Sequence, residues 1–112
     1  MKCMLSSAQI GWVDDAARLG LQFVYFNGDD TSSEGKRMFE YTGGGVAALD
    51  YDLDGWCDLY FTQGTTWPPV SANDRFMDAL VRNGAGLRMD DVSRQAGIQD
   101  VGFGQGVSSG DF

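Results

Sequence analysis

The sequence predicts an all-β protein, and three features of its 112 residues favour that class. All but two of its 16 acidic residues are Asp, which suits turns and loops, whereas helix surfaces favour the longer Glu. Sixteen glycines allow many tight turns. The apolar residues form short runs between turn signals and do not keep a helical spacing over long segments. Together these features favour a loop-rich sheet.

Three strands are expected before residue 63. Residues 21–26 are rich in β-branched and aromatic side chains and are closed by turn residues at 27–30. The apolar run at residues 46–49 is too short for a stable helix, so it predicts a buried strand. Residues 57–62 alternate in character, which predicts a strand with two distinct faces. The last two strands flank a turn rich in Asp.

The second half predicts a β-hairpin. Residues 80–83 and 87–89 flank the sequence Asn-Gly-Ala-Gly, in which Asn and Gly tolerate the positive φ of tight turns. A helix over residues 75–82 is the alternative, because its apolar residues also have helical spacing. Residues 64–73 hold both prolines and predict an exposed loop. Residues 91–97 predict a short helical turn closed by Gly97.

A repeated pattern divides the chain. Residues 43–51 recur 61 residues later as residues 104–112, and residues 18–21 recur as residues 95–98. In such an array each unit buries its faces against its neighbours. We therefore expect three parts: a lead-in segment with one or two strands at residues 1–42, one complete repeat with the Asp-rich loop at residues 43–103, and the start of the next repeat at residues 104–112.

The charge of the chain limits its partners. The chain has 16 acidic and 8 basic residues, no His and a net charge of −8, so attraction to nucleic acid or to an anionic membrane surface is not expected. No apolar run reaches the ~20 residues of a membrane-spanning helix, and residues 1–10 lack the apolar stretch of a secretory signal. Cys3 and Cys57 leave two alternatives open, one disulfide or two separate thiols. The excess of carboxylates favours a cation as partner.

The strongest candidate site is the Asp-rich turn, whose carboxylates occupy positions 1, 3, 5 and 9: Asp50, Asp52, Asp54 and Asp58. Two bare carboxylates about 4 Å apart repel by roughly 4 kcal/mol at an effective dielectric constant of ~20. Ca²⁺ would offset this repulsion, because it accepts about six to eight oxygen ligands from flexible loops. Gly55 permits the sharp bend, and the carbonyl of Trp56 would supply a further oxygen.

The Asp-rich turn is also compatible with a different ion, a different motif or no ion at all. Mg²⁺ fits less well, because it keeps several waters and requires octahedral geometry. An EF-hand shares the first six positions but needs Glu at position 12, where this chain has Phe61. Residues 52–55 resemble the nucleophile motif of haloacid-dehalogenase-type phosphotransferases, although Trp56 replaces the usual Thr or Val. A solvated acidic hairpin without an ion is the simplest alternative.

Residues 43–62, GGGVAALDYDLDGWCDLYFT, resemble the FG-GAP or VCBS-type calcium-binding repeat of integrin-α-like β-propellers. The wider pattern is most similar to bacterial relatives of cartilage acidic protein, the group with UnbV-type domains, and it includes residues 20–24, 26–28, 80–84, 91–98 and 104–112. The resemblance implies four-stranded antiparallel blades around a channel, of which this chain supplies one to two, an incomplete propeller. It also implies a set of calcium ligands: Asp50, Asp52, Asp54, the Trp56 carbonyl and Asp58.

The turn and the resemblance together predict a non-catalytic, calcium-binding structural and interaction module. The family implies an extracellular, cell-surface or periplasmic location and a protein or glycan partner of the parent propeller. Two alternatives are a metal-dependent hydrolase or phosphatase that uses the Asp cluster, and calcium-dependent carbohydrate binding by Trp56 and Trp67. The lack of His as a general base separates the hydrolase from the binding module. Strand edges without neighbouring blades would be open to self-association.

Overall fold

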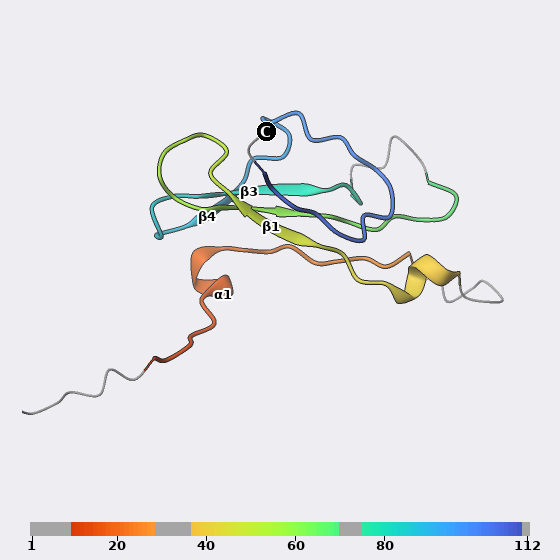
Figure 1. Ribbon diagram of the computed structural model, residues 1–112, viewed down its shortest axis with the longest axis horizontal. Helices are drawn as coiled ribbons and strands as arrows, with labels where there is room; N and C mark the ends of the chain where they lie inside the picture. The colour runs from red at the N-terminus through yellow and green to blue at the C-terminus, as the bar shows by residue number, and fades with distance from the viewer. Residues whose placement is uncertain (1–9, 29–36, 70–74, 111–112) are drawn as a thin grey trace, which may run out of the picture.

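The computed structural model describes residues 10–28, 37–69 and 75–110 (Figure 1). Its centre is one four-stranded antiparallel sheet, in which each strand pairs with the next along the chain. This architecture confirms the expected all-β class. The elements, in chain order, are α1 (Ala16–Leu19), the 3₁₀ helix η1 (Met38–Tyr41), β1 (Val46–Leu49), β2 (Asp58–Phe61), β3 (Ala79–Asn83) and β4 (Met89–Asp91).

The two strands beside the Asp-rich turn form as predicted. β1 and β2 pair from Val46 opposite Phe61 to Leu49 opposite Asp58. β1 is less buried than expected, since Ala47 is its one buried residue and Val46 is exposed. The reason is position, because β1 lies at an edge of the sheet.

The predicted hairpin is confirmed, and residues 80–83 belong to a strand and not to a helix. β3 and β4 pair from Val81 opposite Asp91 to Asn83 opposite Met89. Ala85 and Gly86 both have positive φ, and the N–H of Gly86 donates to the Asn83 side-chain oxygen at 2.8 Å. The turn after β4 also forms as predicted and ends at Gly97, which has a φ of 74°.

The strand expected at residues 21–26 does not join the sheet, and the described part of residues 1–42 contains no strand. Instead the backbone of this segment is hydrogen-bonded to the side chain of Gln63. The N–H of Phe26 donates to the Gln63 Oε1 at 2.7 Å, and the Gln63 Nε2 donates to the Val24 carbonyl at 3.0 Å. The side-chain amide of Gln63 pairs with only these two backbone groups. Residues 21–26 therefore form no ladder of backbone hydrogen bonds with a strand.

Aromatic contacts hold the same segment against the sheet. Phe23 stacks on Phe61 of β2 with ring centroids 4.5 Å apart, and Phe26 stacks on Phe76 at 4.2 Å. Beneath this layer the loop after β2 is partly buried, which corrects the expectation of an exposed loop: Gly64 and Thr65 are buried, and exposure begins at Trp67.

Gln63 is itself fixed by a buried carboxylate. Asp78 accepts a hydrogen bond from the Gln63 N–H at 2.8 Å and another from the Tyr60 hydroxyl at 2.8 Å. Tyr60 lies in β2 and Asp78 directly precedes β3. These bonds therefore connect the centre of the sheet to the segment that covers it.

The hydrogen bond between Tyr60 and Asp78 is expected to make the chain less stable at alkaline pH. Burial, and after it the hydrogen bond to Asp78, raises the pKa of Tyr60 to about 12 from an ordinary value of 10.0. Folding thus favours the protonated phenol, and its contribution is present below pH 10 and is lost as pH rises toward 12. We expect the free energy of unfolding to fall over this window, and to fall less in a Tyr60→Phe variant. Urea unfolding at several pH values measures both slopes, and equal slopes would contradict the prediction.

The coil near the C-terminus lies beside β1 and runs in the same direction. A Cβ built on Gly45 would come within 2.8 Å of the Gly106 Cα, so the two backbones touch. Further along, the Ser109 hydroxyl donates to the Ala48 carbonyl at 3.1 Å, a contact across 61 residues. The two stretches that recur in the sequence are therefore neighbours in space at the offset of the recurrence.

Some expectations fall on residues outside the described ranges. These are Cys3, residues 29–30 of the first turn, residues 70–73 of the proline-containing loop, and Asp111. Cys57 is exposed, and its pairing with Cys3 stays a prediction. Among the described residues, no helix combines the length and the apolar character needed to cross a membrane.

Candidate metal site

The pairing of β1 with β2 brings the two ends of the Asp-rich turn together. Asp50 directly follows Leu49, which lies opposite Asp58. The turn then folds back on Asp50, whose carboxylate accepts hydrogen bonds from the N–H groups of Asp54 at 3.0 Å and Gly55 at 2.9 Å. Gly55 has a φ of 87°, a conformation that favours glycine. Local backbone geometry thus closes the loop around its first carboxylate.

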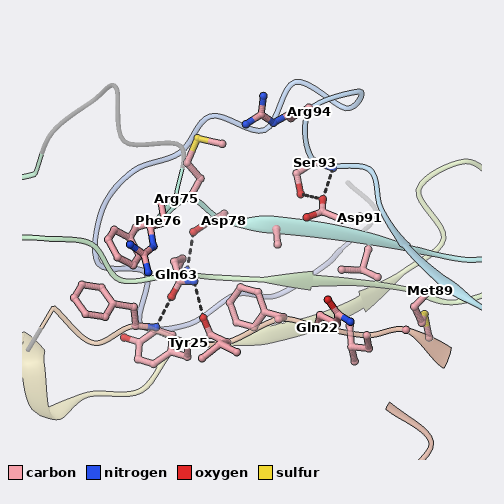
Figure 2. Close-up of a pocket in the computed structure, with 18 of the residues that line it drawn as sticks. Gln22, Tyr25, Gln63, Arg75, Phe76, Asp78, Met89, Asp91, Ser93 and Arg94 are labelled. Atoms are coloured by element: carbon pink, nitrogen blue, oxygen red, sulfur yellow. Dashed lines mark hydrogen bonds between the residues drawn. The ribbon is translucent and has the colours of Figure 1, made fainter. Parts of the chain in front are cut away.

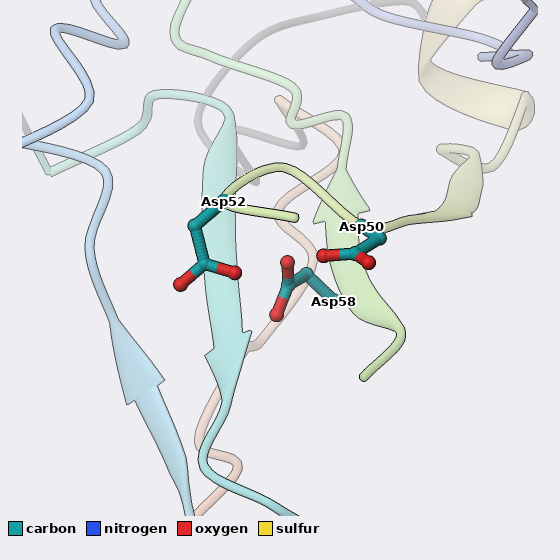
Figure 3. Close-up of side chains that lie close together, drawn as sticks. All are labelled: Asp50, Asp52 and Asp58. Carbon is teal, nitrogen blue, oxygen red and sulfur yellow. The ribbon is translucent and has the colours of Figure 1, made fainter. Parts of the chain in front are cut away.

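Three carboxylates meet at this turn. Asp50, Asp52 and Asp58 each offer one oxygen, and these oxygens lie within 4.8 Å of one another. Figure 3 shows the three side chains directed toward one space between the turn and the sheet. Such a group could hold a metal ion. β1 and β2 position Asp50 and Asp58, and the bend of the loop positions Asp52.

Asp58 is the most buried of the three, with 0% of its surface exposed. One of its oxygens accepts the N–H of Tyr51 at 2.9 Å and the other accepts the N–H of Asn83 at 2.8 Å. Within the described residues no Lys or Arg forms an ion pair with it. A buried carboxylate without a positive partner is costly, so a cation at this position would stabilise it.

Asp54 lies outside this group of three. Its Oδ1 accepts the N–H of Trp56 at 2.9 Å, and its Oδ2 accepts a bond from the Arg82 guanidinium at 2.9 Å. The predicted roles of Asp54 and of the Trp56 carbonyl as ligands therefore stay predictions.

Arg82 also belongs to the candidate site, although no pattern in the sequence predicted it. From β3 its Nε donates to the Asp52 Oδ2 at 2.5 Å, in addition to its bond with Asp54. The hydrogen bond to Asp52, and then the charge of that carboxylate, raises the pKa of Arg82 above its ordinary value, so the guanidinium stays positive. No local signal marks this residue, because only the register between β2 and β3 places it at the turn.

A groove lies on the other side of the molecule, between residues 20–26 and the sheet (Figure 2). Its volume is about 980 Å³. Its two carboxylates, the buried Asp78 and the exposed Asp91, already accept hydrogen bonds, Asp78 from Tyr60 and Gln63 and Asp91 from the hydroxyl and N–H of Ser93. The groove therefore lacks a cluster of open ligands comparable to the turn.

The two tryptophans of the carbohydrate-binding alternative lie at opposite ends of β2. Trp56 precedes the strand and its ring lies against Gly86 at the tip of the hairpin. Trp67 follows the strand and contacts Phe39, with ring centroids 5.3 Å apart. Both rings are about half exposed, but they do not form one platform.

Comparison of the chain with protein-family models, with curated proteins and with solved structures finds no match. The resemblance to FG-GAP or VCBS-type repeats thus stays a prediction from sequence motifs. The candidate metal site is therefore supported by its geometry alone.

Proposed function

We propose that this chain is a non-catalytic, calcium-stabilised repeat of a β-propeller, which acts as a structural and interaction module of a secreted or cell-surface protein. The observation that carries the proposal is the convergence of Asp50 and Asp52 on the fully buried Asp58. Three carboxylates on one turn provide up to about six oxygens, which suits Ca²⁺ better than the strict octahedral preference of Mg²⁺. We therefore propose Ca²⁺ as the ion.

The arrangement of the sheet supports the propeller part of this proposal. A four-stranded antiparallel sheet with sequential strand order is the unit from which propellers are built. When such a unit is repeated around an axis, equivalent positions of successive units lie side by side and run in the same direction. Gly45 beside Gly106, and Ala48 beside Ser109, have this relation.

The ion would act as a clamp between three strands. Asp50 extends β1, Asp58 begins β2, and Asp58 also accepts the N–H of Asn83 in β3. An ion that binds only the folded chain stabilises it by mass action, by about 2.7 kcal/mol at 100 times the dissociation constant. The proposed role is therefore to hold the turn and the hairpin tip in one geometry.

Calcium titration tests the proposal. We expect binding heat with a dissociation constant of about 10⁻⁴ to 10⁻³ M, as in extracellular calcium modules, and a rise in melting temperature in millimolar Ca²⁺. An Asp50→Asn/Asp52→Asn variant should lose both effects, while Asp90→Asn, which alters a β4 carboxylate paired with Arg88 and not part of the group of three, should keep them. Mg²⁺ should bind more weakly. Absence of both heat and melting shift in the unaltered chain would overturn the proposal.

Removal of Arg82 is expected to strengthen calcium binding. Its guanidinium occupies oxygens of Asp52 and Asp54, and its positive charge repels a cation nearby. An Arg82→Met variant should therefore bind Ca²⁺ about 5- to 10-fold more tightly. Arg88→Met is the matched control, because Arg88 pairs with Asp90 and not with the turn. Calorimetry compares the three proteins, and an unchanged or weaker affinity in Arg82→Met would show that Arg82 does not compete with the ion.

A further inference from the structure

Two segments far apart in the chain, at residues 14–21 and 91–98, fold in the same way. Each begins with an Asp whose Oδ1 accepts the N–H two residues later: Asp14 from Ala16 at 3.1 Å, and Asp91 from Ser93 at 2.9 Å. Each ends with a glycine of positive φ, 80° at Gly20 and 74° at Gly97.

Three backbone hydrogen bonds between these end points also recur at equivalent positions. In the first segment they run from Leu19 to Asp15, from Gly20 to Ala17 and from Leu21 to Ala16; in the second they run from Ala96 to Val92, from Gly97 to Arg94 and from Ile98 to Ser93. Their lengths are 2.9, 3.2 and 2.9 Å in both segments. The last two bonds of each set form the Schellman closure of a helical turn. Residues 14–21 and 91–98 are thus structural equivalents.

This equivalence identifies the residues just before α1. The second segment begins in β4, so Met89–Asp91 corresponds to residues 12–14. β4 pairs with β3, and its Met89 lines the groove of Figure 2. Residues 12–14 belong to no strand, and Trp12 and Val13 are 95% and 81% exposed. They have the sequence position of a fourth strand without the sheet that a fourth strand needs.

We infer that residues 12–14 form the fourth strand of a separate sheet. The other three strands of that sheet belong to a preceding repeat of the same kind. The partner is an edge strand equivalent to β3, in the register in which Asn83 lies opposite Met89. Trp12 then takes the place of Met89 and covers the equivalent groove. Alternation of side chains along a strand places Asp14 on the same face, as Asp91 is in β4.

A second copy of this chain does not offer such an edge. Its β3 already pairs with β2 on one side and with its own β4 on the other. The partner of residues 12–14 is therefore a preceding repeat that has only three strands of its own. Its fourth strand comes from the repeat that follows it in sequence. The inference shares the repeated architecture of the proposed function but does not depend on calcium, so a failed calcium titration leaves it intact.

The test supplies the missing edge within one chain. In a fusion protein, residues 43–88 are joined directly to residue 12 of the sequence that continues to residue 112, so that Trp12 follows the hairpin tip as Met89 does. We expect backbone amide exchange at residues 12–14 to be about 100-fold slower than in the unfused chain. A control with one Gly inserted before residue 12 shifts the strand by one residue, reverses its faces and should lose this protection. A folded fusion protein with unprotected residues 12–14 would overturn the inference.

A second pair of variants decides the matter if the fusion protein does not fold. In the unfused chain, Met89→Trp with Asp90→Val gives β4 the sequence of residues 12–14, because Asp91 already matches Asp14. We expect cooperative unfolding and slow amide exchange in β4 to be retained. The reversed pair, Met89→Val with Asp90→Trp, directs the large ring away from the groove and should have the lower melting temperature. Loss of β4 protection in the first variant, or equal melting temperatures, would contradict the inference.

Discussion

Replacement of Asp58 by Asn is expected to lower the free energy of unfolding by about 2–4 kcal/mol in calcium-saturated buffer. The buried carboxylate accepts one backbone N–H at each oxygen, from Tyr51 and Asn83. An amide offers one oxygen and one NH₂, so one of these N–H groups would face a donor. The variant would also lose a negative charge from the proposed ion site. Both effects act in the same direction when calcium is present.

The loss should be smaller in chelator. Without the ion, Asn at this position also relieves the repulsion that Asp50 and Asp52 exert on the buried charge, and this relief offsets part of the lost hydrogen bond. Urea unfolding with calcium and with chelator measures both values. Asp90→Asn is the control, because its exposed ion pair with Arg88 contributes about 0–1 kcal/mol. Equal losses in the two buffers would argue against an ion at Asp58.

A methyl group at Gly64 is expected to destabilise the chain by about 2–3 kcal/mol. A Cβ built there would clash with the carbonyl oxygen of Phe26, which belongs to the backbone of residues 21–26. Backbone cannot turn aside as a flexible side chain does, so residues 21–26 must move away from the sheet. That movement would break the two bonds between Gln63 and this segment.

Gly43→Ala is the matched control for Gly64→Ala. No atom lies within 4 Å of a Cβ at Gly43, so alanine there should be neutral or slightly stabilising. Urea unfolding gives the stabilities, and amide exchange at residues 21–26 should be faster in Gly64→Ala alone. If both variants were as stable as the unaltered chain, Gly64 would not lie in close contact with residues 21–26, and the prediction would be contradicted.

Local signals in the sequence predicted the sheet well. Asn83 and the glycines after it predicted the β3–β4 hairpin, and Gly97 predicted the end of the turn after β4. The alternation at residues 57–62 and the Asp-rich turn predicted the β1–β2 hairpin. The segment at residues 21–26 was predicted as a strand from its composition, but composition does not show whether a neighbouring backbone is available to pair with it.

The sequence by itself determined the class of the protein, the places of its turns and the carboxylates of its candidate site, because turn chemistry and side-chain period act within a few residues. The tertiary structure alone decided which carboxylates meet, that Arg82 reaches Asp52, and that Gln63 takes the place of a strand for residues 21–26. It also decided that residues 106–109 lie beside β1. The contacts of Arg82, of Gln63 and of residues 106–109 join positions 28 to 61 residues apart, and they follow from the order and register of the strands, which no local stretch of sequence encodes.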